Sequence, residues 1–369
     1  MKRNISMIAC SLVVLFSGSL FGDAAVAPAS KKKQTMPVNQ GEPMNSSQMV
    51  AGYNHPARVN TTSDWDMFLT ASYTYWDVQE EGMEIGPLFT SSPAASNAQP
   101  SGSLVFEDAY RSGFKVGLGW NTPFDDWVVT AEYTWFHHAI DKGQPANTFL
   151  TSNFLQAKTT PFDYTTEDLF TTSSHKWKID LDVVDVMLSR PFYQGTRLTI
   201  NPSFGLKGIL LNQKYTVTGN VSGGAFNPTK AHGKTDSWAV GPSFGMGGNF
   251  LLGAGFRMMG SMAGTLAFTR YNGIKYLAKS QAVGKPDLAL EHSAQNRVRA
   301  IGDAQAGFGW GMYLCDQQYH IDLSATYEFQ VYWNQNMINW YSASLIGLNG
   351  ASPGNLYFQG LTVNATFDF

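Results

Sequence analysis

Apolar and polar residues alternate with a period of two along most of the chain from Asp64 onward. In residues 319–333, one face carries Ile321, Leu323 and five more apolar residues, while the other carries polar or charged residues from His320 to Gln330. Successive side chains of a β-strand point to opposite faces, so this alternation predicts strands with one face in an apolar environment. Ten such segments occur: 64–78, 111–121, 126–138, 175–191, 196–214, 236–250, 253–271, 297–314, 318–333 and 355–369.

The intervals between these segments alternate between long and short. The long intervals are 79–110, 139–174, 215–235, 272–296 and 334–354, and short turns near Pro123, Gln194, Leu251 and Asp316 separate the remaining pairs. Short periplasmic turns opposite long external loops are typical of outer-membrane barrels. The pattern therefore predicts an all-β, transmembrane antiparallel up-and-down β-barrel of about ten strands. The interval 139–174 leaves room for one more hairpin, so 12 strands stay open, and the longest segments are expected to extend outward beyond the bilayer.

The composition is consistent with a lipid-facing exterior. Charged residues make up 14% of the chain, whereas soluble domains carry roughly 25%. Beyond the N-terminal stretch, no apolar run reaches the roughly 18 residues that indicate a transmembrane helix. A soluble β-sandwich can also show alternation, but it does not usually have strands this long with apolar faces that end in Trp and Tyr. The aromatic residues that suit two membrane-surface girdles are Trp65, Tyr73, Tyr75, Trp120, Trp127, Trp135, Trp177, Trp238, Trp310 and Trp333.

The N-terminus has the organisation of a secretory signal peptide. Lys2 and Arg3 precede an apolar stretch from Ile5 to Phe16, and small residues follow it. We place the signal peptide at residues 1–22, a disordered periplasmic leader rich in Ala, Pro and Ser at 23–60, and the outer-membrane barrel at 61–369. Removal of the signal leaves Cys315 as the one cysteine of the mature chain, so a disulfide framework is excluded.

The last residues form a ladder that ends in an aromatic residue. Leu361, Val363, Phe367 and Phe369 alternate with polar residues, and the chain ends at Phe369. Such a ladder is similar to the C-terminal signal that the barrel-assembly machinery recognises. The pattern therefore predicts this machinery and the lipid of the outer membrane as partners.

Several segments of the second half share their order and residues with a known family. They are Trp238 to Gly247 (WAVGPSFGMG), Leu251 to Gly255 (LLGAG), Arg299 to Trp310 (RAIGDAQAGFGW), Tyr327 to Asn336 (YEFQVYWNQN), and Gly360 to Thr362 leading to Phe367 to Phe369. Together they resemble the Legionella-type major outer membrane protein family of pore-forming barrels, also represented in chlamydia-related bacteria. The resemblance implies a porin-like pore and an abundant surface antigen. With one mature cysteine, the chain is not expected to join a disulfide-linked envelope network.

In a pore, charged side chains that line the lumen set the electric field and the selectivity. The face opposite the apolar ladder offers five basic and six acidic candidates: Lys115, Glu132, Lys178, Asp180, Asp182, Lys207, Arg257, Arg299, Asp303, Asp322 and Glu328. Their near balance predicts weak ion selectivity in an open lumen. In a small ten-stranded barrel, the same charges can instead pair with one another and fill the interior.

An enzyme would require a different set of groups. His137, His138 and Asp141 lie where the third segment ends, and His175 opens the fourth, so these groups could approach one another. Neither a Ser–His pairing signal nor an H-x-x-x-H motif accompanies them, and we predict no enzyme, no cofactor and no metal. The net charge of −3 gives no basic footprint for nucleic acid.

The sequence therefore predicts a channel in the bacterial outer membrane for passive diffusion of ions and small polar solutes. The alternative is an adhesin or host-interaction surface that acts through the long loops and conducts little. The interval 139–174 is rich in Phe and would either constrict the lumen or present a sticky surface. Homo-oligomerisation stays open, because nothing in the sequence specifies an interface.

Overall fold

The computed structural model describes residues 54–62, 66–90, 99–106, 110–151, 169–221, 229–279, 288–338 and 353–369. The predicted signal peptide at 1–22 and residues 23–53 of the predicted leader lie outside the described residues. Within the described ranges, no helix is long and apolar enough to cross a membrane.

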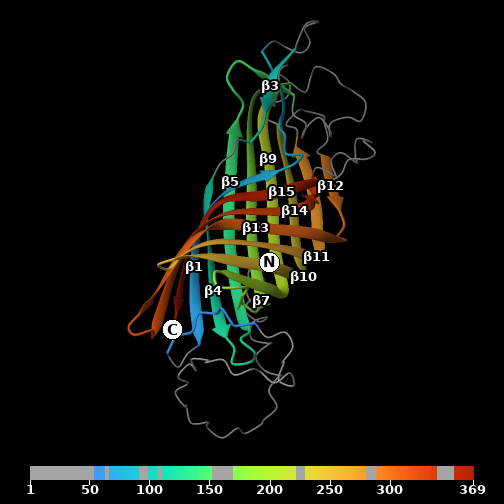
Figure 1. The fold of residues 1–369 in the computed structure, drawn as a ribbon. Helices are drawn as coiled ribbons and strands as arrows, with labels where there is room; N and C mark the ends of the chain where they lie inside the picture. The colour runs from blue at the N-terminus through green and yellow to red at the C-terminus, as the bar shows by residue number, and fades with distance from the viewer. Residues whose placement is uncertain are drawn as a thin grey trace, which may run out of the picture. The chain divides into compact units, whose positions relative to one another are not determined.

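Ten long strands form the framework of residues 54–369 (Figure 1). They are β1 (Met67–Glu80), β4 (Arg111–Asn121), β5 (Val128–Gly143), β7 (Leu169–Ser189), β9 (Leu198–Val221), β10 (Thr229–Gly253), β11 (Phe256–Lys279), β13 (Gln295–Leu314), β14 (Tyr319–Asn336) and β15 (Gly354–Asp368). Each pairs antiparallel with its neighbours in chain order. The last strand also pairs with the first, from Phe68↔Asp368 to Glu80↔Leu356, so the ring closes into a barrel.

Five short strands lie in the connections. They are β2 (Gly86–Phe89), β3 (Pro100–Leu104), β6 (Phe149–Thr151), β8 (Phe192–Tyr193) and β12 (Leu288–His292). β2 pairs with β3 and with β6, so parts of the first two long connections meet at one end of the barrel. We call this end the loop side and the opposite end, with the short connections, the turn side.

The predicted architecture is confirmed: the chain is an all-β, closed antiparallel barrel, and each of the ten predicted segments overlaps one long strand. The strands extend further on the loop side than predicted. β9 and β10 take up most of the predicted interval 215–235, and β5 and β7 take up both ends of 139–174. The centre of the latter interval, residues 152–168, lies outside the described residues.

Near the turn side the barrel has an apolar outer face and a polar inner face. On β14, Leu323 and Tyr327 are 47% and 52% exposed, whereas Thr326 and Glu328, the residues on either side of Tyr327 in the sequence, are 4% and 6% exposed. Apolar residues point toward lipid in an outer-membrane barrel, and polar residues point inward. This outward apolar band continues around the ring, for example at Leu118, Phe204, Phe244 and Met262.

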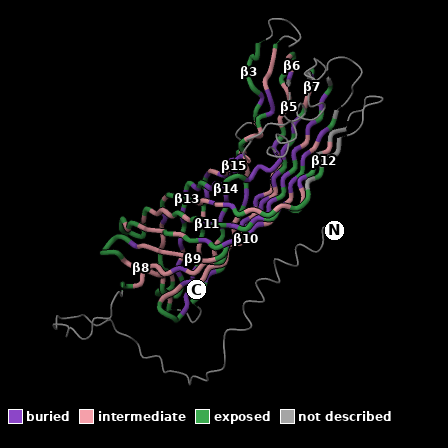
Figure 2. Tube along the Cα trace, turned by 90° about the vertical axis from the view of Figure 1, so that its right-hand side faces the viewer, coloured by how far each residue is buried: buried purple, intermediate pink, exposed green. Residues whose placement is uncertain are grey.

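On the loop side the pattern of β7 reverses. Trp177, Ile179 and Leu181 are at most 2% exposed and face the interior, while the alternating Lys178 side chain is 52% exposed. The outward apolar residues of β7 begin only at Val184 and Val186. Above the apolar band the strands project into water, so the outside becomes polar and the inside becomes an apolar core. Figure 2 shows the buried stretches of β5 and β7 in this extension.

The turns on the turn side contain residues in the left-handed backbone region. Gly253 and Gly255 flank Ala254 in the β10–β11 turn, with φ of 114° and 83°. Glycine adopts these φ values at no steric cost, so the chain can reverse direction between β10 with 25 residues and β11 with 24 residues. Cys315, Asp316 and Gln317 make the β13–β14 turn, and Cys315 is exposed there with a free thiol.

Residues 54–62 run across the turns of the turn side. The backbone amide of Ala57 donates to the carbonyl of Pro191, and that of Thr62 donates to Gln317. Between them, the Arg58 guanidinium donates to the carbonyl of Thr122 at 2.7 Å. These three turns belong to separate strand pairs of the ring, so residues 54–60, the end of the predicted leader, contact the barrel.

Candidate functional site

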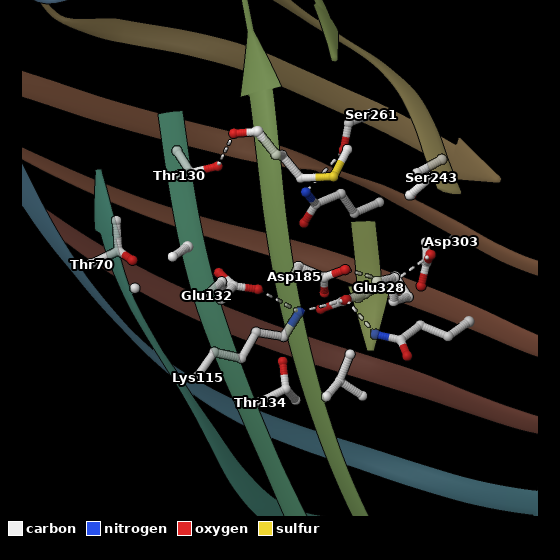
Figure 3. Close-up of a pocket in the computed structure, with 18 of the residues that line it drawn as sticks. Thr70, Lys115, Thr130, Glu132, Thr134, Asp185, Ser243, Ser261, Asp303 and Glu328 are labelled. Atoms are coloured by element: carbon white, nitrogen blue, oxygen red, sulfur yellow. Dashed lines mark hydrogen bonds and ion pairs between the residues drawn. The ribbon is translucent and has the colours of Figure 1, made fainter. Parts of the chain in front are cut away.

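A polar cavity of about 300 Å³ lies inside the barrel toward the turn side (Figure 3). Nine of the ten long strands, all except β15, supply its lining, and six charged residues take part in it. The charged residues are Lys115, Glu132, Asp185, Lys207, Asp303 and Glu328, and polar neighbours include Thr70, Thr130, Thr134, Ser243, Ser261, Gln305 and Gln330. We call this space the turn-side cavity.

Lys115 joins three strands of the cavity wall. Its Nζ lies 2.7 Å from Glu328 Oε1 and 3.9 Å from Glu132 Oε1, so a cation on β4 pairs with carboxylates on β14 and β5. The Glu328 carboxylate also accepts hydrogen bonds from Gln330 Nε2 at 2.7 Å and from Thr362 Oγ1 at 2.8 Å. Because the pair is buried and fully bonded, it fixes the separation of strands that are not neighbours in the ring.

Lys207 makes a second bridge across the cavity. Its Nζ lies 3.0 Å from Asp303 Oδ2 and 3.6 Å from Asp185 Oδ1, and only 7% of the lysine is exposed. Asp303 Oδ1 is buried and accepts no hydrogen bond from the protein, and Asp185 Oδ1 has only its 3.6 Å ion pair with Lys207. Buried polar atoms without a protein partner are normally satisfied by water. Packed side chains leave this space unfilled, and we expect water to satisfy the buried oxygen of Asp303.

The charges of the turn-side cavity do not cancel. Two ammonium groups, Lys115 and Lys207, face four carboxylates. The formal charge is thus −2 when all six groups are ionised. A confined space with excess negative charge attracts cations and repels anions.

Apolar side chains fill the interior directly above the cavity. We call this cluster the apolar seal; it consists of Trp76, Val78, Ile85, Leu104, Phe136, Ile140, Leu150, Phe170, Trp177, Ile179, Leu181, Tyr215, Tyr332, Leu356 and Phe358. The rings of Trp76, Phe136 and Phe358 lie with centroids 5.5–6.0 Å apart. Lys115 marks the boundary, since its Nζ lies 5.1 Å from the centroid of the Trp76 ring.

The long connections contribute to the seal. Ile85 directly precedes β2 and Leu104 is the last residue of β3. They are 0% and 3% exposed, and the amide of Ile85 donates to the carbonyl of Leu104 at 3.0 Å. Phe106 packs against Trp177 and Tyr215 with centroids 6.0 and 5.8 Å apart. The first connection thus folds over the barrel interior rather than away from it.

Arg299 is a buried cation at the edge of the seal. It is 5% exposed, and its guanidinium carbon lies 4.7 Å from the centroid of the Tyr271 ring. Its Nε and Nη2 atoms have no protein acceptor, and Glu80 Oε1 across the interior has no donor. These orphaned atoms indicate further water beside the apolar side chains.

At the turn side, Arg257 makes a two-pronged contact with Asp322. Arg257 Nη2 donates to Asp322 Oδ1 at 2.7 Å, and Nη1 donates to the other carboxylate oxygen. His320 and Asp368 form a neighbouring pair at 2.9 Å. A planar guanidinium held at both oxygens is among the stronger charged contacts in proteins. It links β11 to β14 across the β13 strand that lies between them.

Eight of the eleven predicted lumen-facing residues lie on the interior face. They are Lys115, Glu132, Lys207, Arg257, Arg299, Asp303, Asp322 and Glu328. The other three, Lys178, Asp180 and Asp182, are wrongly placed by the sequence analysis, because they lie on the outer face of β7 beyond the apolar band. There Lys178 pairs with Asp180 at 2.6 Å, and His137 pairs with Asp182 at 2.9 Å.

Asp185 is an interior residue that the sequence pattern did not predict. It follows Trp177, Ile179, Leu181 and Val183 at a spacing of two, and that face was assigned to lipid. The Asp185 carboxylate on this face argued against contact with lipid, because a charged side chain facing lipid in the middle of a strand destabilises a membrane barrel. Glu80, which bonds Gln213 Nε2 at 2.8 Å in the interior, was missed because it lies beyond the predicted end of its segment.

The histidines considered for an enzyme do not come together. His137 is on the outer face, and His138 bonds the carbonyl of Ser112. His175 is buried inside, with Nδ1 2.9 Å from the hydroxyl of Tyr215, and Asp141 pairs with Lys176 at 3.3 Å. Across the described part of the chain, no three His, Cys, Asp or Glu side chains are grouped to hold a metal ion.

Residues 54–369 match the family described as "Legionella pneumophila major outer membrane protein precursor". No curated protein sequence matches the chain.

Among solved structures, the chain is similar to outer-membrane β-barrels of low sequence identity. The outer membrane protease OmpT from Escherichia coli is 8% identical, with 85% of this chain and 99% of that chain covered and a TM-score of 0.41. The attachment invasion locus protein Ail of Yersinia pestis is 8% identical (83% and 99% covered, TM-score 0.23). A Pseudomonas aeruginosa FadL homologue is 7% identical (82% and 89% covered, TM-score 0.28). Likenesses at this level assign no activity to the chain.

Proposed function

We propose that this chain, which belongs to the Legionella major outer membrane protein family and forms a β-barrel of the bacterial outer membrane, is a channel for passive diffusion of ions and small polar solutes. The turn-side cavity is the vestibule of this channel, and the apolar seal is its constriction. The channel carries out no covalent chemistry and needs no cofactor.

The unfilled cavity with its charged lining is the observation that supports this proposal. A barrel that serves only as a scaffold can fill its interior with packed side chains, as small barrels do. Here the interior around Lys115, Lys207 and Asp303 keeps about 300 Å³ free, and the buried Asp303 Oδ1 lacks a hydrogen-bond partner in the protein. A small hydrated solute fits such a space.

The apolar seal gives the channel a means of closing. Narrow hydrophobic constrictions stop conduction by excluding water. Because Ile85 and Leu104 belong to the connection around β2 and β3, movement of that connection opens the interior without breaking the ring of strands.

The test is the conductance of the refolded barrel in a planar lipid bilayer. We expect discrete steps with a weak preference for cations, because the cavity carries four carboxylates and two ammonium groups. A barrel that is folded, as judged by its heat-modifiable migration, but silent over long recordings and high voltages would overturn the channel proposal.

A second candidate function is an interaction surface for a host or envelope partner. It is favoured by the loop-side extension, in which β5, β7, β9, β10 and β11 rise beyond the apolar band over a filled interior. Binding of labelled barrel in lipid nanodiscs to host cells tests this function. Substantial binding by a barrel that does not conduct would favour it over the channel.

The proposal includes how the chain is exported and assembled in the outer membrane. Residues 1–22 are removed as a signal peptide, and the barrel-assembly machinery recognises Leu361, Val363, Phe367 and Phe369. The first three of these are 40–46% exposed on the outer face of β15, which leaves them available for recognition. Self-association of the barrel in the membrane and a role as a surface antigen are further parts of the proposal.

A further inference from the structure

Four lysines lie in one row across four adjacent strands of the loop-side extension. The register pairs Lys178 of β7 with Lys214 of β9, Lys214 with Lys234 of β10, and Lys234 with Lys275 of β11. Residues directly opposite each other in an antiparallel sheet point to the same face, with Cβ atoms about 5 Å apart. We call these four residues the lysine row.

The lysine row faces outward. The side chains of Lys178, Lys234 and Lys275 are 52%, 48% and 58% exposed, and Lys214 is also exposed. The residues that directly precede these lysines along the strands, such as Trp177 and Gln213, point to the opposite face and are buried in the interior. Like charges directly opposite each other on a sheet destabilise it, so the row is a cost to the fold unless an anion offsets it.

Carboxylates of the chain offset this charge only at the ends of the row and beneath it. Lys178 pairs with Asp180 at 2.6 Å, Lys234 pairs with Asp236, and Lys275 pairs with Glu291 at 2.6 Å. The residue that corresponds to Asp180 and Asp236 beneath Lys214 is Asn212, an amide. In the described chain no carboxylate forms an ion pair with Lys214, so the uncompensated charge lies at the centre of the row.

The row lies just above the apolar band. Four residues down β7, β9 and β10, the corresponding row contains Asp182, Leu210 and Trp238, and it ends at the exposed Arg270 of β11. The next row down is apolar, with Val240 and Phe268. Four residues of a strand tilted as in such barrels correspond to roughly 10 Å of height. Tryptophan marks the membrane interface, and lysine side chains bend toward headgroups. The lysine row is therefore at the level of the headgroups of the outer leaflet.

We infer that the lysine row binds the phosphate groups of a phosphorylated lipid headgroup in the outer leaflet, with Lys214 at the centre of the site. A phosphate placed over Lys214 meets the ammonium groups of Lys178 and Lys234 on both sides and the amide of Asn212 below. Its charge compensates the lysine that the protein leaves unpaired. This inference is independent of the channel proposal, because it concerns the outer face and not the lumen.

The experiment is a titration of the full refolded barrel in zwitterionic detergent with bis-phosphorylated lipid A, followed by native mass spectrometry. Lys214→Glu is the test variant. Lys230→Glu is the matched control: it makes the same change of net charge on an exposed residue of the same extension, four residues farther from the band than Lys234. Heat-modifiable migration of each variant shows that the barrel has folded.

We expect Lys214→Glu to weaken lipid A binding about tenfold or more, because a charge-assisted contact becomes a repulsion, and Lys230→Glu to change it less than about twofold. Removal of both phosphates from the lipid should have an effect similar to that of Lys214→Glu. Equal weakening by both variants, or no effect of Lys214→Glu, would overturn the inference. Binding of inorganic pyrophosphate as tight as that of lipid A would also overturn it, since the site would then serve a soluble phosphate.

Discussion

Lys115 of β4 and Glu328 of β14 form an ion pair of 2.7 Å across the barrel interior, although β1 and β15 separate their strands in the ring. Both side chains are largely buried, at 12% and 7% exposure. The pair therefore links two parts of the wall that backbone hydrogen bonds do not join, and it does so next to the turn-side cavity. Neutralising either residue of the pair leaves the other as a buried charge without its main partner.

We predict that Glu328→Gln lowers the free energy of unfolding by about 1–3 kcal/mol, because Lys115 loses its short partner and keeps only Glu132 at 3.9 Å. Urea unfolding of the barrel in lipid vesicles, followed by tryptophan fluorescence, measures this loss. The double variant Lys115→Met with Glu328→Leu should be less destabilised than the sum of its single variants. Strict additivity would show that the pair does not couple the two strands.

Phe358 provides a test of the apolar seal. It is 1% exposed and packs against Trp76, Phe136 and Tyr332, so Phe358→Ala should leave a cavity and cost about 3–5 kcal/mol of stability. Phe308→Ala removes the same ring from the lipid-facing surface, where the residue is 63% exposed, and should cost much less. The comparison uses the same unfolding measurement. Equal costs would contradict a packed interior at Phe358.

His175 makes the loop-side core sensitive to acid. It lies on β7 well above the apolar band, outside the membrane-spanning part of the strand, and burial lowers its pKa from 6.5 to about 4. The folded chain therefore binds a proton less readily than the unfolded chain. Stability is complete above about pH 6.5 and falls as the pH drops toward 4, by up to about 3 kcal/mol.

Unfolding free energies measured between pH 7 and pH 4 test this prediction. In His175→Gln, which carries no titrating group at this position, the component of the pH dependence between 6.5 and 4 should disappear. A variant with an unchanged pH profile would show that other groups account for the acid sensitivity.

The charge of the turn-side cavity predicts the effect of substitutions on ion selectivity. Glu132→Gln reduces the formal charge of the cavity from −2 to −1 and should lower the cation preference of the conducting barrel. The reversal potential in a salt gradient measures it. Asp180→Asn is the matched control, because Asp180 lies on the outer face beside Lys178. A larger shift for Asp180→Asn than for Glu132→Gln would contradict the placement of both residues.

The sequence was sufficient to predict the strands, because a lipid-facing strand must be apolar at every second position. Residues such as Leu323 and Tyr327 on β14 therefore show the strand and its face together. Glu328 and Lys115, on the faces opposite the apolar positions, lie inside as predicted. This relation between apolar positions and the outer face depends on lipid surrounding the strand, so it holds only for the part of each strand that lies within the bilayer.

Where the strands leave the bilayer, the sequence alone gave the wrong face. Trp177 to Val183 alternate with Lys178 to Asp182 just as in a lipid-facing strand, but there the water is outside and the apolar face is inside. The alternation of apolar and polar residues does not show which face of the strand is in contact with water. The seal was not predicted either, because Ile85 and Leu104 lie in a connection without periodicity, and their burial depends on contacts with distant strands.

The most direct test of the central claim is a comparison of single-channel conductance between the complete barrel and a variant whose β2–β3 hairpin, residues 86–104, is replaced by a short Gly-Ser linker. Both proteins are refolded, checked for heat-modifiable migration and recorded in the same planar bilayers. We predict that the variant has larger or longer-lived open steps, because Leu104 and the hairpin no longer cover the interior above the turn-side cavity. Two folded barrels that are equally silent, or that conduct identically, would contradict a sealed channel.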